Sequence, residues 1–153
     1  MSEKSIALAD TLLKQDEILS ELLSITVKQR DALKEGRLSD LQNLMSELRH
    51  VSVRCQAIET KRVRLSEDLA GLLGCDQVVS QIVSALPREE GLVVEESAKK
   101  LMQTVNRLKI EMSILSRLMD EARTLNEMLI SEWRRLGEKS MGLGAMGTFD
   151  TRI

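Results

Sequence analysis

Apolar residues in this chain recur at the spacing of long amphipathic helices and do not alternate as in strands. The clearest pattern runs from residue 39 to residue 73, where two rows at seven-residue spacing lie next to each other. One row holds Leu44, Val51, Ile58, Leu65 and Leu72, and the other holds Leu41, Leu48, Cys55, Arg62 and Leu69. Five heptads of this kind predict a coiled-coil-like helix. Ser39 and Gln42 have the spacing of a capping box, and Gly74 is placed to end the helix.

Two further long helices are predicted, at about residues 5–35 and 94–136. In the first, Leu12, Leu19 and Leu33 share a row that is broken by Thr26. Gly36 follows directly, so this helix and the next should form an antiparallel hairpin. The last helix has one row of Leu101, Leu108, Leu115, Ala122, Leu129 and Leu136, and a companion row of Ala98, Val105, Met112, Met119, Asn126 and Trp133. Gly137 is expected to end it.

The segment between the second and third long helices predicts a short helix at about residues 76–86, packed across the end of the bundle before Pro87. A strand is the alternative, because the segment is rich in Val and Ile, but it would have no partner strand. After residue 136 the periodicity stops, and four glycines fall among seventeen residues. We therefore predict an all-α fold: an antiparallel three-helix bundle over residues 1–136 and a flexible, glycine-rich tail over residues 137–153.

Charge and composition narrow the possible functions. The 22 basic and 24 acidic side chains are interleaved and give a net charge of −2, which argues against nucleic acid as the main partner. No segment approaches the roughly 20 consecutive apolar residues of a membrane span. Glu3 and Asp10 interrupt the N-terminal segment, which is therefore not a secretory signal. A soluble, cytoplasmic protein is expected.

Catalytic and metal-binding chemistry is not expected. His50 is the single histidine, and it follows the core position Leu48 by two residues, so it should point to solvent. The two cysteines, Cys55 and Cys75, have neither the spacing nor the neighbouring histidines of a metal site. The pattern predicts a protein that is not an enzyme and that needs no cofactor or metal.

The C-terminal third carries the features typical of a binding surface. The chain has two aromatic residues, Trp133 and Phe149, and six of its eight methionines lie at or after Met102. Flexible thioethers suit adaptable interfaces. Asn126 falls in a core row, which allows two interpretations. It either sets the helix register inside the bundle, or the helix leaves the bundle there and Asn126 faces a partner.

Several segments, in their order and spacing, resemble the family of FlgN-type flagellar export chaperones. DALKEGRLSDLQNL and the helix through Leu73 are similar to that family's hairpin and second helix. ALPREEG is similar to its short break before the last helix. LNEMLIS, with Asn126, resembles its asparagine followed by two aliphatic residues, and GTFDTR resembles its tail motif, with Phe149 at the tyrosine position.

The resemblance implies a cytoplasmic type III export chaperone. Such a chaperone binds C-terminal segments of the hook–filament junction proteins FlgK and FlgL, prevents their premature assembly, and delivers them to the export gate protein FlhA. The client would contact Leu125, Asn126, Met128, Leu129, Ile130, Trp133 and Leu136, and Phe149 would contact the gate. A monomer or weak dimer is expected. The alternative is a self-associating coiled-coil adaptor or structural protein.

Overall fold

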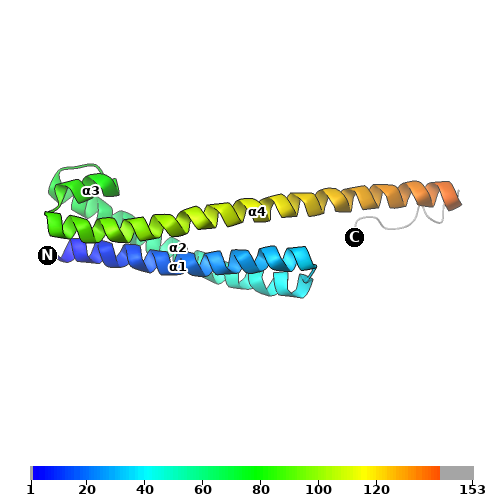
Figure 1. Ribbon diagram of the computed structural model, residues 1–153, viewed down its shortest axis with the longest axis horizontal. Helices are drawn as coiled ribbons and strands as arrows, with labels where there is room; N and C mark the ends of the chain where they lie inside the picture. The colour runs from blue at the N-terminus through cyan, green and yellow to red at the C-terminus, as the bar shows by residue number, and fades with distance from the viewer. Residues whose placement is uncertain (1, 142–153) are drawn as a thin grey trace. The chain divides into compact units, whose positions relative to one another are not determined.

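The structure, a computed structural model, describes residues 2–141 (Figure 1). It contains four helices: α1 (Glu3–Glu35), α2 (Leu38–Leu73), α3 (Val79–Ala85) and α4 (Arg88–Met141). All regular secondary structure in the described residues is helical, which confirms the predicted all-α class. The chain divides into two compact units, Met1–Leu115 and Ser116–Ile153, and α4 contributes residues to both.

An antiparallel hairpin of α1 and α2 forms the larger part of the first unit (Figure 1). Three pairs of side chains are hydrogen-bonded between the two helices: Gln15 with Glu59, Glu21 with Arg54, and Gln29 with Met45. The residue numbers in each pair add to 74 or 75, about twice 37, so the helices are aligned symmetrically about Arg37. Gly36 makes this reversal possible because it adopts a left-handed φ of 69° at the end of α1.

Within the first unit, α1 and the beginning of α4 run parallel to each other. The backbone N–H of Ser2 donates a hydrogen bond to the carboxylate of Glu90, and the hydroxyl of Thr104 donates one to the carboxylate of Asp16. Both pairs are separated by 88 residues in sequence, so the two helices advance together over this stretch. The expected three-helix arrangement therefore has α2 antiparallel to both of its long neighbours.

The first unit contains two clusters of buried apolar side chains. One draws on all four helices: Leu8, Ala9, Leu12, Leu69, Ala70, Ile82, Leu86 and Val94. The other comes from the hairpin alone: Ile18, Ile25, Ala32, Leu44, Val51 and Ile58. The predicted core row of α2 is thus buried as far as Ile58, but its last member, Leu72, is 71% exposed. A straight helix drifts about 20° per heptad, so four heptads turn Leu72 away from the face that Leu44 occupies.

Several element ends differ from the sequence-based prediction. The short helix is present, shorter than expected, and α4 begins at Arg88 instead of Val94. Pro87 lies at the start of α4, where its carbonyl accepts from the N–H of Gly91 at 2.8 Å and a missing backbone donor costs little. The helix also continues past Gly137 to Met141. The predicted capping box of Ser39 and Gln42 does not form, because Arg37 precedes the helix and makes no side-chain cap bond.

Part of the predicted tail therefore lies in α4, and residues 142–153 lie outside the described residues. Within residues 2–141, no helix combines the length and apolar character that crossing a membrane requires.

Candidate protein-binding face of the C-terminal helix

The inner face of α4 in the first unit is defined by two rows that turn toward α1. Leu101, Thr104, Leu108, Glu111 and Leu115 are all buried or half-buried, whereas Met112 is exposed. The row that accompanies Leu101 and Leu108 toward α1 is therefore the one through Thr104 and Glu111. The predicted companion row is half-buried at Ala98 and Val105 and becomes exposed from Met112 onward. The row through Thr104 and Glu111 is not apparent in the sequence because these two successive members of it are polar.

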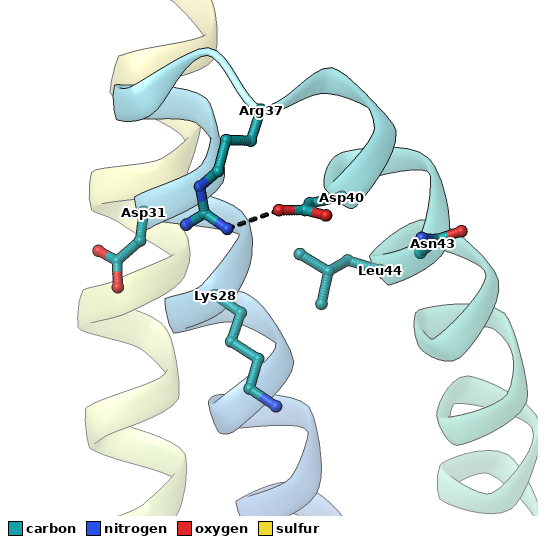
Figure 2. A pocket seen from close by; sticks show the side chains of 6 residues that line it. All are labelled: Lys28, Asp31, Arg37, Asp40, Asn43 and Leu44. Carbon is teal, nitrogen blue, oxygen red and sulfur yellow. Dashed lines mark hydrogen bonds and ion pairs between the residues drawn. The ribbon is translucent and has the colours of Figure 1, made fainter.

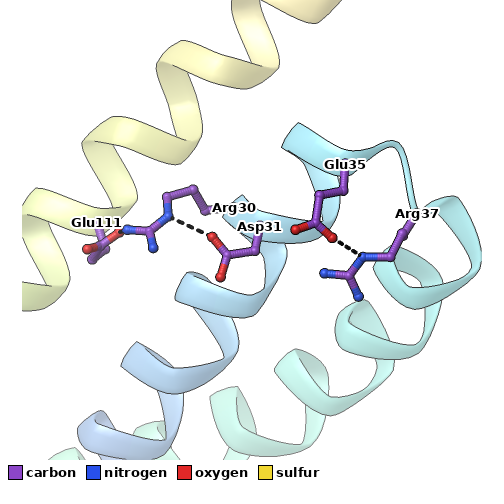
Figure 3. Close-up of polar contacts among 5 residues, drawn as sticks. All are labelled: Arg30, Asp31, Glu35, Arg37 and Glu111. Atoms are coloured by element: carbon purple, nitrogen blue, oxygen red, sulfur yellow. Dashed lines mark hydrogen bonds and ion pairs between the residues drawn. The ribbon is translucent and has the colours of Figure 1, made fainter.

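Both polar members of the inner face bind residues of α1. Thr104 donates to Asp16, which is 6% exposed, and Glu111 accepts from Arg30 Nη1 at 2.6 Å (Figure 3). Arg30 also donates to the neighbouring Asp31 at 3.3 Å. The hydrogen bond to Glu111 is the largest influence that raises the pKa of Arg30. Polar contacts between α1 and α4 thus alternate with the buried side chain of Leu108 along this part of the interface.

The same two rows continue in the second unit as Leu118, Ala122, Leu125, Leu129, Glu132 and Leu136. We call the five apolar members, without Glu132, the distal seam. Leu118 is half-buried, but Leu125, Leu129 and Leu136 are 57%, 60% and 51% exposed. A contiguous row of exposed leucines is characteristic of a surface that another protein covers. The distal seam is therefore the candidate functional site.

The predicted client-binding residues do not all lie on one face of α4. At about 100° per residue, Leu125, Leu129, Trp133 and Leu136 fall within an arc of roughly 80°. Asn126 lies just beyond Trp133 on one edge. Met128 and Ile130 lie about 100° to either side of Leu129, on opposite flanks. The helix therefore brings four of the seven side chains together, places Asn126 beside them, and separates the other two.

Asn126 and Trp133 are both exposed, Trp133 by 58%. Exposure contradicts the interpretation of Asn126 as a register-setting residue buried inside this bundle. The predicted gate contact, Phe149, lies outside the described residues. Sequence reasoning also missed Leu118 as a member of this face, whereas Ala122 already belonged to the predicted row of Leu101 and Leu129. The signal that identifies Leu118 is the heptad continued through the polar positions Thr104 and Glu111.

The described residues also form a hollow beside the turn between α1 and α2. It has a volume of about 230 Å³ and is lined by Lys28, Asp31, Arg37, Asp40, Asn43 and Leu44 (Figure 2). Arg37 donates to Asp40 at 2.6 Å and to Glu35 at 2.7 Å, so its charge is balanced within the protein. The hydrogen bond to Asp40 is the largest influence that raises the pKa of Arg37. These pairings leave Arg37 committed to contacts within the protein.

The described residues hold no group of three or more His, Cys, Asp or Glu side chains that could bind a metal ion. His50 is exposed, as the sequence predicted. Burial raises the pKa of the Cys55 thiol, which keeps this cysteine protonated and poorly reactive near neutral pH. The exposed leucines of α4 thus form the stronger candidate functional site among the described residues.

An exposed apolar helix face of this kind is typical of surfaces through which proteins bind other proteins. The family described as "FlgN protein" matches residues 1–148, nearly the whole sequence. The chain therefore belongs to the FlgN family and is a flagellar export chaperone. Searches of curated proteins and of solved structures found no match.

Proposed function

We propose that this chaperone binds C-terminal segments of the hook–filament junction proteins FlgK and FlgL in the cytoplasm and delivers them to the export gate protein FlhA. The observation that carries the proposal is the exposed distal seam of α4. A bound client segment would hide its own assembly surface, which prevents premature assembly. Family membership supports the chaperone class, and the seam suggests where the client binds.

The spacing of the seam suits an amphipathic client helix. Leu125, Leu129 and Leu136 recur at helical spacing and would contact the apolar face of a helix laid along them. Each leucine that becomes fully buried contributes about 1.5–3 kcal/mol. A client segment that is disordered before binding loses conformational entropy when it folds onto the seam, and this cost keeps the complex weak enough to release its client.

We assign different contributions to the seven client-binding residues. Leu125, Leu129, Trp133 and Leu136 would form the central contact, and Asn126 would hydrogen-bond at its edge. Met128 and Ile130 would touch the client only where it extends around the helix, because they lie on opposite flanks. Substitution of either flank residue should therefore weaken binding less than substitution of Leu129.

A binding measurement tests this assignment directly. Peptides from the C-termini of FlgK and FlgL are titrated into the full chain and into a Leu125→Ser/Leu129→Ser variant. We expect the variant to lose at least tenfold in affinity. The control is Leu72→Ser, since Leu72 is a leucine on α2 that is exposed even more than Leu125 and Leu129. Unchanged affinity in the double variant, or an equal loss in the control, would refute the assignment.

For Phe149 we propose a contact with FlhA. A chain ending at Met141 keeps all of α4 and removes this residue. This truncation should weaken FlhA binding and leave FlgK and FlgL binding intact. The reverse pattern would show that the tail serves the client and not the gate.

The rival function is a self-associating adaptor that binds no client. It predicts a dimer that persists at nanomolar concentration and has no affinity for either junction-protein peptide. The chaperone proposal predicts binding of at least one peptide by a chain that is monomeric under those conditions. Peptide titration at nanomolar chain concentration separates the two.

A further inference from the structure

We propose that residues 118–136 of α4 pair antiparallel with the same segment of a second copy of this chain, forming a weak homodimer that covers the distal seam. The proposal stands on the exposure of this segment and on the self-complementarity of its sequence, and it does not depend on the identity of the client.

The apolar rows fit one antiparallel register. When Leu129 of one copy faces Leu125 of the other, the same register places Leu118 opposite Leu136. Two-fold symmetry repeats each of these two contacts, so the interface contains four layers of facing leucines. The remaining layers place Ala122 opposite Glu132. A small Ala122 leaves room for the aliphatic stem of Glu132, whose carboxylate accepts from Arg135 Nε of its own chain at 3.2 Å.

The polar residues along the edges agree with the same register. Glu121 and Arg135 lie on one edge of the seam, and the register places Glu121 of each copy opposite Arg135 of the other. Arg135 keeps its bond to Glu132 in this arrangement, since a guanidinium has five donors. On the opposite edge, Asn126 faces Asn126 of the second copy. An asparagine amide both donates and accepts, so this pair satisfies itself across the symmetry axis.

A parallel pairing of the same segment is disfavoured. It would place Glu132 of both copies in a single layer, where two like charges would be brought together with little solvent around them. It would also separate Glu121 from Arg135 of the second copy. The charge pattern therefore selects the antiparallel orientation.

The length of the segment predicts a weak dimer. Residues 118–136 span roughly 28 Å of helix, and five apolar side chains from each copy form the seam. Such an interface falls toward or below about 1,200 Å², the lower limit for stable protein pairs. We expect dissociation in the micromolar range, which leaves the seam available at low concentration.

Charge reversal in the full chain tests the pairing. Sedimentation velocity over a concentration series should show a monomer–dimer equilibrium for the natural sequence. Glu121→Arg and Arg135→Glu, each alone, should weaken the dimer at least tenfold, because each brings like charges together across the interface. The double variant restores opposite charges and should return to within about threefold of the natural sequence. Glu127→Arg, about 160° from Leu129 around the helix, is the control and should leave the dimer unchanged.

A second measurement tests the orientation. The register brings Met128 of the two copies together, and Met128 is 63% exposed in the single chain. Met128→Cys, in a background with Cys55→Ser and Cys75→Ser, should form a covalent dimer under mild oxidation, whereas Glu127→Cys should not. A chain that is monomeric at several hundred micromolar, a double charge variant without recovery, or equal cross-linking at the two positions would overturn the proposal.

Discussion

At the scale of single residues, two helical glycines have opposite surroundings. A Cβ atom on Gly91 would lie 2.8 Å from the backbone carbonyl oxygen of Val83, because α3 packs closely against the start of α4 (Figure 1). A Cβ on Gly71, in α2, would meet nothing within 4 Å. Gly91 is therefore required for helix contact, while Gly71 only weakens its helix.

We predict that Gly91→Ala lowers the free energy of unfolding by about 1–3 kcal/mol, since the backbone of α3 must move to admit the methyl group. Gly71→Ala should raise it by up to about 1 kcal/mol, because alanine is the better helix former. Urea unfolding followed by circular dichroism measures both. Changes of the same sign in the two variants would contradict this account of Gly91.

Glu59 links stability to pH. Arg62 donates to its carboxylate at 2.8 Å and Gln15 donates at 2.6 Å. The hydrogen bond from Arg62 is the main cause that lowers the pKa of Glu59 below its ordinary value of 4.5. A lowered pKa means that the stabilisation is complete above pH 4.5 and is lost as the pH falls through the folded-state value.

We therefore expect Glu59→Gln to reduce the fall in stability that the natural sequence shows below pH 4.5. Arg62→Gln should reduce it as well, because it removes the principal cause of the shift. The effect is modest, since the side chain of Glu59 is 46% exposed and solvent screens the pair. Unfolding curves from pH 6 to pH 3 measure it. If both variants lost stability with falling pH as the natural sequence does, the Glu59–Arg62 pair would not contribute to the pH dependence.

Glycines also show what sequence can predict at this scale. Gly36 and Gly74 were predicted to end helices, and both adopt the left-handed conformation. Gly137 was interpreted in the same way, yet it lies inside α4. Gly91, which fell in the predicted break before the last helix, also lies inside α4. A glycine selected for close helix contact has the same sequence signature as one selected for a left-handed turn. Only the nearby backbone of Val83 identifies Gly91 as a glycine of close helix contact.

At the scale of elements, α4 uses one amphipathic pattern in two environments. Leu108 and Leu129 belong to the same row, three heptads apart, yet Leu108 is 7% exposed and Leu129 is 60% exposed. The pattern therefore supplies core packing in the first unit and an exposed face in the second. Sequence periodicity identifies the row but does not show at which residue the other helices stop burying it.

These two leucines should respond differently to truncation. Leu108→Ala removes buried methyl groups and should lower the free energy of unfolding by about 2–4 kcal/mol. Leu129→Ala should change it by less than about 1 kcal/mol and instead weaken client binding. Thermal unfolding and peptide titration of both variants give the four values. A stability loss at Leu129 as large as that at Leu108 would mean that the distal seam is part of this chain's core.

The inner face of α4 marks the limit of prediction at this scale. Thr104 and Glu111 contact α1 through Asp16 and Arg30. Apolar periodicity does not identify such positions and instead indicates the neighbouring row, which is half-buried at Val105 and exposed at Met112. The four helices, the hairpin and the break before Pro87 were predictable because each depends on local signals. The pairing of polar side chains between helices depends on three-dimensional proximity and could not be predicted from the sequence.

At the scale of the whole molecule, the apolar face of α4 would have two alternative partners. A client segment and a second copy of the chain would both cover the distal seam. Client binding should then favour the monomer, because the two partners exclude each other. This competition would let the free chaperone bury its apolar surface in a dimer and still replace the second copy with a client.

Site-specific photo-cross-linking tests the central claim, that the distal seam is the client-binding face. A photoreactive residue is placed at position 129, at position 125, or at the exposed position 72 of α2. Each full chain is then irradiated with the C-terminal segment of FlgK or FlgL. The account predicts cross-links to the client from positions 125 and 129 and none from position 72. Cross-links from position 72 together with none from the distal seam would contradict it.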